Sequence, residues 1–409
     1  MLCIGIDWAD DKHDICIRDA ADRRILAECA IDHDAEGVAQ LDETVVALGA
    51  QLHECLIAVE TPHGLLVGYL LQAGYVVYAI PPRAVDRYRD RHRQSGAKTD
   101  QIDARVLADI LCVDRAYHRA IPSDSPLAQE IKLTSRQRRK LVVERTRLKN
   151  QLTACLKAYY PVALHLFSGL DRAITWSFLR AYPDAEAAAA ASLAELEVFF
   201  SQNGYSCPHK IPEIHAQLQA PAIPVADWQV RASRRHMLLL VELLATLVSH
   251  IKAYDKRLSE LLDQHPDAFI FRSLPNVGDV TAAWLLGEIG DCRDKFEAAS
   301  GMQALAGTCP ITVQSNKQRR IYFRVGCCKS FRNAMQQFSR LSARGRHSSS
   351  WAKGYLNDQI SRGHSVSRGT RALANRWLAI IFRLWQDRVV YDEKIHLRNR
   401  AQRGRRLSA

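Results

Sequence analysis

The N-terminal quarter of the chain alternates between short β-rich runs and helical patterns, and the order of these segments leaves few possible folds. Runs of the strand type occupy 2–7 (LCIGID), 14–19 (DICIRD) and 25–31 (ILAECAI). Polar turns separate them at hairpin distance, so they predict three antiparallel strands. A helical pattern follows over 35–48, with apolar residues at 3,4,3 spacing.

Two further strand and helix pairs continue this region. We expect strands at 55–60 (CLIAVE) and 75–80 (YVVYAI), a helix at 63–72 between them, and a last helix that carries Asp103. The order β-β-β-α-β-α-β-α is typical of a mixed sheet with helices on its faces, and it is the order of the ribonuclease-H-like fold. A sugar-kinase-like actin fold shares the three opening strands, but the sequence contains no later repeat of them.

Four acids fall at the ends of these predicted elements. Asp7 ends the first strand, Glu60 ends the fourth, and Asp100 and Asp103 begin the last helix. If the first and fourth strands are neighbours, their ends lie side by side, and a helix packed over them presents residues i and i+3 to the same place. Four converging carboxylates repel one another unless cations lie between them, so the pattern predicts a site for Mg²⁺ or Mn²⁺ that acts in phosphodiester chemistry.

Each acid alone is also compatible with a simpler role. Asp7 fits a turn residue and Glu60 fits a polar strand end, whereas Asp100 and Asp103 fit helix N-terminal acids that favour the macrodipole. It is the combination of all four positions that favours the metal site.

A basic segment lies just before the last predicted helix. Residues 83–98 contain six Lys or Arg and two Asp. Basic side chains beside a carboxylate cluster suit an enzyme that holds a nucleic-acid backbone at its metals, and the candidates are Arg83, Arg87, Arg91 and Lys98. A solvated basic loop is the alternative.

Two long helices dominate the middle of the sequence, at 127–160 and 232–263. The second has a heptad seam with 3,4 spacing, made of Met237, Leu240, Leu244, Leu247, Ile251, Tyr254, Leu258 and Leu261. The seam predicts a coiled-coil arm that pairs with the first helix, with a second chain, or with both. An ordinary long core helix is the alternative, and the helical insert between the two contains no recognisable chemistry.

The C-terminal part begins with SLPNVGDVTAAWLLGEIG at 273–290, which has the pattern of a helix-hairpin-helix around Gly278. Its turn amides and the next helix N-terminus suit phosphate binding, and a plain helical turn is the alternative. A loop is expected at 305–320, followed by helices to about residue 391.

Charge and cysteine content limit the class of partner and the compartment. The net charge is +12, and from residue 317 to the end there are 22 Lys or Arg against four acids. This excess predicts a polyanionic partner. Eleven cysteines without a Cys-x-x-Cys pair suit reduced cytoplasmic thiols, and no apolar run reaches the roughly 20 residues that a membrane span needs.

Six stretches together resemble one known family. They are GIDWADDKHDICI, AVETP, IPPR with KTDQIDARVLADIL, LPNVGDVTAAWLLGEIG, LAGTCPITVQSNKQRR and RALANRWLAIIFRLWQDRVVYDE. In this order they resemble the DEDD transposases of the insertion-sequence one-ten family, which includes the Piv/MooV DNA invertases. The resemblance implies an α/β plus α architecture in four parts: a RuvC-like, ribonuclease-H-type domain (1–125), a coiled-coil region with an insert (126–265), a mainly helical transposase domain (266–394) and a basic tail (395–409).

The resemblance also implies roles for residues and partners. The four acids carry over as the catalytic metal ligands, and PITVQSN points to Ser315 as a nucleophile, with Asn316 where the family usually has glycine. Thr312 is the weaker hydroxyl candidate, and Lys317, Arg319 and Arg320 would offset phosphate charge. The implied partners are donor and target DNA, an element-encoded noncoding guide RNA and further copies of the chain, in a bacterial cytoplasm at the nucleoid.

Two rival functions remain compatible with the sequence. A RuvC-like nuclease would hydrolyse DNA with water and form no covalent link to the protein. A nucleic-acid-binding scaffold would use neither the metal nor the serine, and the presence of all four acids speaks against it.

Overall fold

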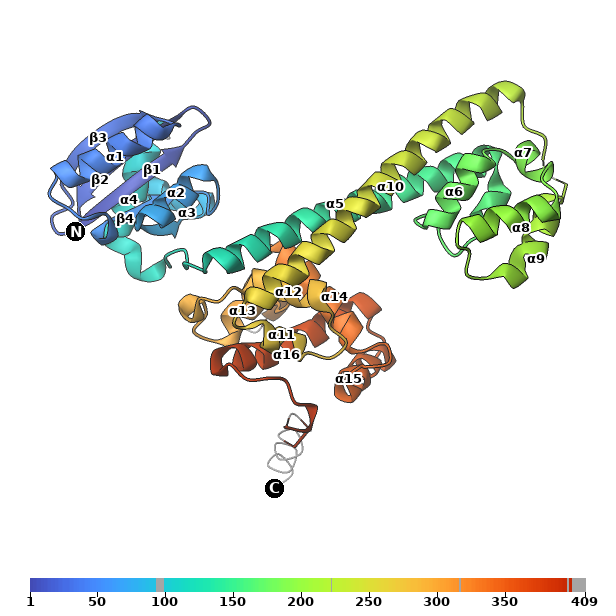
Figure 1. The fold of residues 1–409 in the computed structure, drawn as a ribbon. Helices are drawn as coiled ribbons and strands as arrows, with labels where there is room; N and C mark the ends of the chain where they lie inside the picture. Colours follow the sequence, from blue (N-terminus) through green and yellow to red (C-terminus); the bar gives the residue numbers. More distant parts are fainter. Residues whose placement is uncertain (93–98, 222, 316–317, 396, 399–409) are drawn as a thin grey trace. The chain divides into compact units, whose positions relative to one another are not determined.

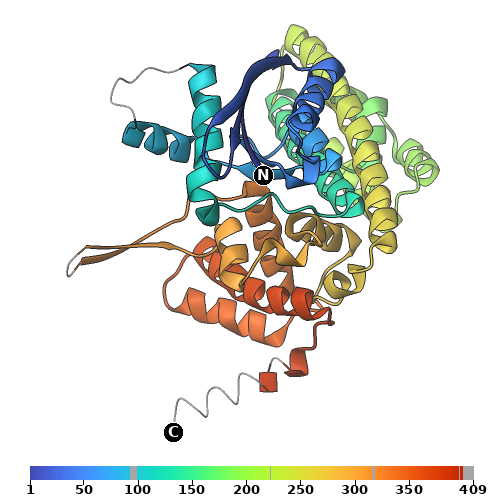
Figure 2. The same ribbon diagram turned by 90° about the vertical axis from the view of Figure 1, so that its left-hand side faces the viewer.

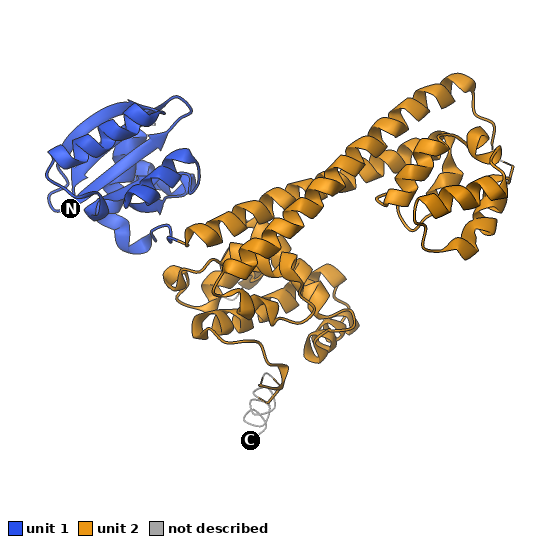
Figure 3. Cartoon of the chain, in the orientation of Figure 1, with its two compact units in different colours: residues 1–123 blue, residues 124–409 orange. Residues whose placement is uncertain are grey.

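The chain folds into two units, residues 1–123 and 124–409 (Figure 3). The computed structural model describes all residues except 93–98, 222, 316–317, 396 and 399–409. Each unit has its own buried core.

A five-stranded mixed sheet forms the centre of the first unit (Figure 1). Its strands are β1 Leu2–Trp8, β2 Lys12–Asp19, β3 Ile25–Asp32, β4 Leu56–Val59 and β5 Val76–Ala79. Their order is β3-β2-β1-β4-β5, with β1 antiparallel to β2 and parallel to β4. The predicted mixed sheet is thus confirmed, and the first and fourth strands are neighbours.

Helices cover both faces of this sheet. They are α1 Ala35–Ala47, α2 Leu65–Ala73, α3 Pro82–His92 and α4 Asp100–Asp114, with short 3-10 turns at Leu52–Glu54 and Arg115–Tyr117. Leu41 of α1 and Leu70 of α2 share a core with Ile4 and Ile6 of β1. On the other face, Leu107 of α4 packs in the core that contains Cys3 and Val85 of α3. Successive β1 residues therefore point to opposite helical layers, as alternation along a strand requires.

Helix α3 was not predicted, since the sequence suggested one continuous basic segment from residue 83. Val85 and Tyr88 lie three residues apart and are both buried, so a single narrow apolar stripe holds this helix to α4. The Tyr88 hydroxyl donates a hydrogen bond of 2.6 Å to Asp109 of α4.

Helix α4 crosses strand β1 at very close range. A Cβ atom on Gly5 would lie 2.0 Å from the Ala104 carbonyl oxygen and 2.5 Å from the Ala108 amide nitrogen. Only glycine allows this approach, because the atoms that it would meet are backbone atoms that cannot move aside. The contact sets the height of α4 above the sheet and thereby the place of its first turn.

Two long helices form the spine of the second unit, α5 Pro126–Tyr159 and α10 Asp227–Gln264 (Figure 1). They pack against each other, and the predicted helices at 127–160 and 232–263 are confirmed. Six of the eight seam residues are buried, and Leu247 and Tyr254 are half-buried. Pairing with a second chain remains a prediction.

An 18-residue window of α10 has a mean hydropathy of 1.5, so this helix is long and apolar enough to cross a membrane by length and composition. This differs from the expectation that no apolar run reaches the length of a membrane span. The buried seam of α10 nevertheless packs with α5, since Leu258 shares a core with Ile131 and Leu240 shares another with Leu156. Core helices of soluble proteins pass the same test, and 28% of this window is buried inside the structure.

The remaining elements of the second unit gather around the two ends of this spine. One group is α6 Ala173–Ala181, α7 Ala185–Ala189, α8 Leu193–Gln202 and α9 Ile211–Leu218. The other is α11 Ala268–Arg272, α12 Asp279–Ile289, α13 Ala299–Leu305, α14 Lys329–Ser342, α15 Ser350–Ser361 and α16 Val366–Asp387, with the hairpin β6 Ile311–Ser315 and β7 Gln318–Tyr322. All eleven cysteines are free thiols, as expected.

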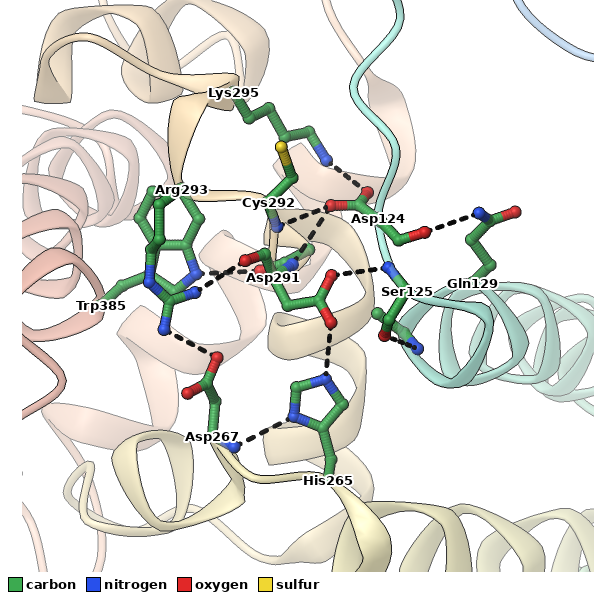
Figure 4. Close-up of polar contacts among 12 residues, drawn as sticks. Asp124, Ser125, Gln129, His265, Asp267, Asp291, Cys292, Arg293, Lys295 and Trp385 are labelled. Atoms are coloured by element: carbon green, nitrogen blue, oxygen red, sulfur yellow. Dashed lines mark hydrogen bonds and ion pairs between the residues drawn. The ribbon is translucent and has the colours of Figure 1, made fainter. Parts of the chain in front are cut away.

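A polar network fixes the start of α5 to the second group (Figure 4). Buried Asp124 accepts hydrogen bonds from the backbone N–H groups of Asp291 and Cys292 and pairs with Lys295 at 2.9 Å. Asp291 in turn accepts from the backbone N–H of Ser125 at 2.8 Å. Because buried carboxylates are costly unless paired, this network holds the first residues of α5 in one place.

Substituting Gly5 by Ala should loosen the first unit. The added methyl group meets backbone atoms of α4, so we expect a loss of about 3 kcal/mol in opening free energy. Amide hydrogen exchange of the peptides covering β1 and α4 should then be about 100-fold faster. Gly68→Ala in α2 is the matched control, because nothing lies within 4 Å of its added Cβ. Unchanged protection of α4 in Gly5→Ala would contradict the packing argument.

Candidate active site and nucleic-acid interface

Asp7 and Glu60 occupy equivalent positions on neighbouring strands. The register of β1 and β4 pairs Cys3 with Leu56 and Gly5 with Ala58, all on the face that α4 covers. Two residues further along each strand, on the same face, come Asp7 and Glu60. Both are half-buried and both make polar contacts. The strand ends therefore bring these two carboxylates together on the α4 side of the sheet.

The first turn of α4 separates the two aspartates that the sequence placed there. Thr99 caps the helix by accepting a hydrogen bond from the Ile102 N–H at 3.3 Å. Asp100 is exposed, whereas Asp103 is only 2% exposed. Because α4 approaches β1 so closely at Gly5, its buried N-terminal residue faces the end of the strand where Asp7 lies. Asp103 is thus the better placed of the two to act with Asp7 and Glu60.

A cation from the unpredicted helix α3 already contacts Asp103. The Arg89 guanidinium donates a hydrogen bond of 2.5 Å to the Asp103 carboxylate and lies 3.5 Å from Asp86. The Arg89 side chain is 13% exposed and that of Asp103 is 3% exposed. A buried carboxylate requires such compensation, so Arg89 belongs to the site although no sequence pattern singled it out. In the sequence, the only sign of this role was that Arg89 directly follows Tyr88, a residue of the apolar stripe of α3.

The carboxylate oxygens of this cluster are the donors that Mg²⁺ and Mn²⁺ prefer. In the described part of the chain, no group of three His, Cys, Asp or Glu side chains is arranged to hold an ion. The chemistry of the donor set fits a hard cation, while the arrangement with Arg89 bound to Asp103 does not close around one.

Three of the predicted nucleic-acid contacts lie on one face of α3. Arg83, Arg87 and Arg91 recur at every fourth residue, and all three are exposed. With Tyr88 and His118 they line a surface cavity of about 450 Å³. Lys98 lies outside the described residues. The row of guanidinium groups suits the repeated charges of a nucleic-acid backbone.

Ser315 ends strand β6 of a hairpin, which corrects the loop expected at 305–320. Every residue of β6 and β7 is exposed, and Figure 2 shows the hairpin as an orange two-stranded ribbon that leaves the helices of the second unit. Ser315 pairs with Gln318 at the tip. Asn316 and Lys317 lie outside the described residues.

The basic residues of the hairpin lie on its second strand. Arg319 and Arg320 of β7 are exposed and pair with Gln314 and Val313. Successive strand residues point to opposite faces, so each face of the ribbon carries one of these arginines. The β-branched run before Ser315 and the Ile321-Tyr322 pair after it were the sequence signals for this hairpin.

Gly278 is the extended residue that precedes α12, and an acid, Asp279, lies at the helix N-terminus. The Asp279 carboxylate accepts from Arg272 at 2.8 Å and from the Ser259 hydroxyl at 2.6 Å. These hydrogen bonds lower the pKa of Asp279, so a negative charge remains at the place where a phosphate would bind. The helix-hairpin-helix assignment stays a prediction.

Comparisons with known proteins agree along the whole chain. A family model described as "Transposase" matches residues 4–161, and the model "Transposase IS116/IS110/IS902 family" matches residues 268–357. The "Mini-circle putative transposase for IS117" of Streptomyces coelicolor is 31% identical, with 95% of each chain covered. The "Insertion element IS900 uncharacterized 42 kDa protein" of Mycobacterium paratuberculosis is 24% identical over 95% of this chain and 96% of its own length.

Addition of Mn²⁺ should distinguish the two aspartates of α4. If the buried carboxylates hold the ion, saturating Mn²⁺ should raise the Tm of the wild-type chain by about 5 °C. The exposed Asp100→Ala variant should keep most of this shift, whereas Asp103→Ala and Asp7→Asn should lose it. Differential scanning calorimetry with and without Mn²⁺ measures the shift within each variant. An equal shift in all four proteins would contradict the predicted site.

Proposed function

The chain belongs to the IS116/IS110/IS902 transposase family, and from this premise we propose that it cuts and rejoins DNA with Ser315 as the nucleophile. The observation that carries the proposal is the place of Ser315 at the tip of a fully exposed hairpin with Arg319 and Arg320 on its second strand. A hydroxyl there is open to a DNA phosphate, and the arginines offset the charge of that phosphate.

The proposed step exchanges one phosphoester bond for another. The Ser315 Oγ forms a bond to the phosphorus atom, and the bond from phosphorus to one deoxyribose oxygen breaks. The serine proton ends on the leaving oxygen, and the DNA is left joined to the protein as a phosphoserine ester. Attack of a second DNA end on this ester reverses the chemistry and rejoins the strands.

The carboxylates of the first unit supply the second half of the proposed site. Asp7, Glu60 and Asp103 would hold a divalent ion of the Mg²⁺ or Mn²⁺ type, with exposed Asp100 as a further candidate. Such an ion, when bound, polarises a phosphate and stabilises a leaving oxygen. Arg89 offsets the charge of the Asp103 carboxylate inside the protein, because the two side chains form an ion pair.

The basic surfaces supply the proposed contacts to nucleic acid. The arginine row of α3 would bind the backbone of DNA or of a noncoding guide RNA, and the seam of α10 would help to assemble several copies of the chain. In such an assembly, the serine and the carboxylates at one DNA strand could come from different subunits. A transposase of this kind acts in the bacterial cytoplasm at the nucleoid.

Substitution of Ser315 by Ala tests the nucleophile. We expect loss of the covalent protein–DNA adduct and a fall in strand cleavage of at least about 1,000-fold, because the attacking oxygen is removed. Adduct formation is measured on denaturing gels with end-labelled DNA. Thr312→Ala, on the same strand, should react as the wild type does. Cleavage that persists without Ser315 and without an adduct would indicate a water-dependent RuvC-like nuclease instead.

Omission of RNA tests the proposed guide. Recombination between donor and target DNA should require RNA transcribed from the sequence that flanks the gene, and changing its target-pairing loop should redirect integration. Sequencing of the recombinant junctions measures both effects. Equal recombination with unrelated RNA would exclude a guide and leave Ser315 chemistry untouched.

A further inference from the structure

Four arginines gather where the β6–β7 hairpin joins the helices of the second unit. Arg324 follows the hairpin closely, Arg332 lies in α14, and Arg368 and Arg371 lie near the start of α16. Phe323, directly after β7, links them: its ring centre lies 4.6 Å from the Arg332 guanidinium carbon and 4.8 Å from that of Arg371. We refer to the four arginines, without Phe323, as the arginine cluster.

The arginine cluster is a concentration of like charge. Among the residues that the structure describes, no carboxylate forms an ion pair with any of the four. Other partly buried arginines of this unit do have such partners, for example Arg136 with Glu288 at 2.8 Å. Burial and the neighbouring charges of Arg332 and Arg368 lower the pKa of Arg371. A bound anion would relieve this repulsion.

The cluster is also held in a defined shape. Arg332 donates to the Arg324 carbonyl oxygen at 2.6 Å. Gly307 makes room for it with a φ of +61°, since a Cβ atom there would lie 2.5 Å from the Arg332 Nη2 atom. The Nε groups of Arg324 and Arg332 are buried without a hydrogen-bond partner in the described structure. Arg371 is half-buried and Arg368 is exposed, so both remain open to a ligand.

We propose that the arginine cluster binds a backbone phosphate of the DNA strand that Ser315 attacks. This inference rests on the proposed function for the role of Ser315, and it adds a second anchoring point on the same strand. Ile311, at the hairpin base, pairs with Tyr322 next to Phe323. Ser315 lies four positions further along β6, or about 13 Å away. Phosphates follow one another at about 3.4 Å along the axis of a DNA strand, so one reaches the base while another lies at the tip.

Salt-dependent binding to DNA tests this site in a chain that cannot react. In the Ser315→Ala background, Arg371→Gln and the exposed Arg368→Gln should each weaken binding about tenfold and reduce the slope of log K against log salt by about 0.9. Fluorescence anisotropy with a labelled 30-base-pair duplex, over a range of NaCl concentrations, measures both. The matched control is Arg383→Gln, also in α16, whose side chain is 75% exposed and pairs with Asp387. It should leave the slope unchanged.

The possible outcomes separate this proposal from the proposed function. Losses in both cluster variants but not in the control support the site, whether or not the serine forms an adduct in its own assay. Equal losses in all three variants would show general attraction by charge and overturn it. Unchanged slopes would overturn it as well. A parallel titration uses an RNA duplex of the same sequence. The cluster variants should lose less affinity for this RNA than for DNA, and a loss confined to RNA would refute the assignment to DNA.

Discussion

The rest of the first unit depends on the close approach of helix α4 to strand β1 at Gly5. Backbone meets backbone there, since even a methyl group on Gly5 would lie 2.0 Å from the Ala104 carbonyl oxygen. A helix held so close to the sheet has its first turn directly over the strand end, which buries Asp103 on the face where Asp7 and Glu60 emerge. The acidic cluster is therefore a consequence of packing as well as of composition. A burial this deep also creates the need for Arg89, because an uncompensated carboxylate would destabilise the fold.

In the second unit, a pair of long helices connects two separate cores. Helices α5 and α10 bury a narrow seam between them, and each end of the pair enters a core of its own. The start of α5 is fixed by Asp124, whose carboxylate accepts hydrogen bonds from the loop that follows α12. Gly290 has a φ of +82° in that loop, and a Cβ atom there would lie 2.0 Å from the Asp124 carboxylate. These contacts thus fix the orientation of the α5–α10 pair relative to the core that carries the hairpin.

Prediction from sequence succeeded where one physical signal dominated. Apolar runs of strand length located the sheet and a heptad seam located α10, because burial imposes those periods. Helix α3 was missed since its ten-residue stretch after Pro82 is mostly charged and only two of its side chains, Val85 and Tyr88, are buried in the core. The β6–β7 hairpin was missed because its strand signals, the β-branched run before Ser315 and the Ile321-Tyr322 pair, are short and none of its residues is buried. The Arg89–Asp103 pair and the arginine cluster depend on contacts between distant elements, and sequence spacing contains no information about such contacts.

The two parts of the proposed site differ in burial. The hairpin that carries Ser315 is exposed, whereas Asp103 is buried and Asp7 and Glu60 are half-buried. A two-stranded ribbon with no buried residue has little stability of its own, so it depends on what it contacts at its base and along its length. At the base, Phe323 packs with Arg332 and Arg371, which gives the ribbon a fixed origin while the Ser315 end stays in solvent. In the proposed function, a DNA strand along the ribbon would cover part of this exposed surface. Asp103 needs no such ligand to be ordered, because α4 and Arg89 already hold it. In the proposed reaction, folding thus fixes the Asp103 carboxylate, whereas the Ser315 hydroxyl at the hairpin tip is open to a DNA phosphate.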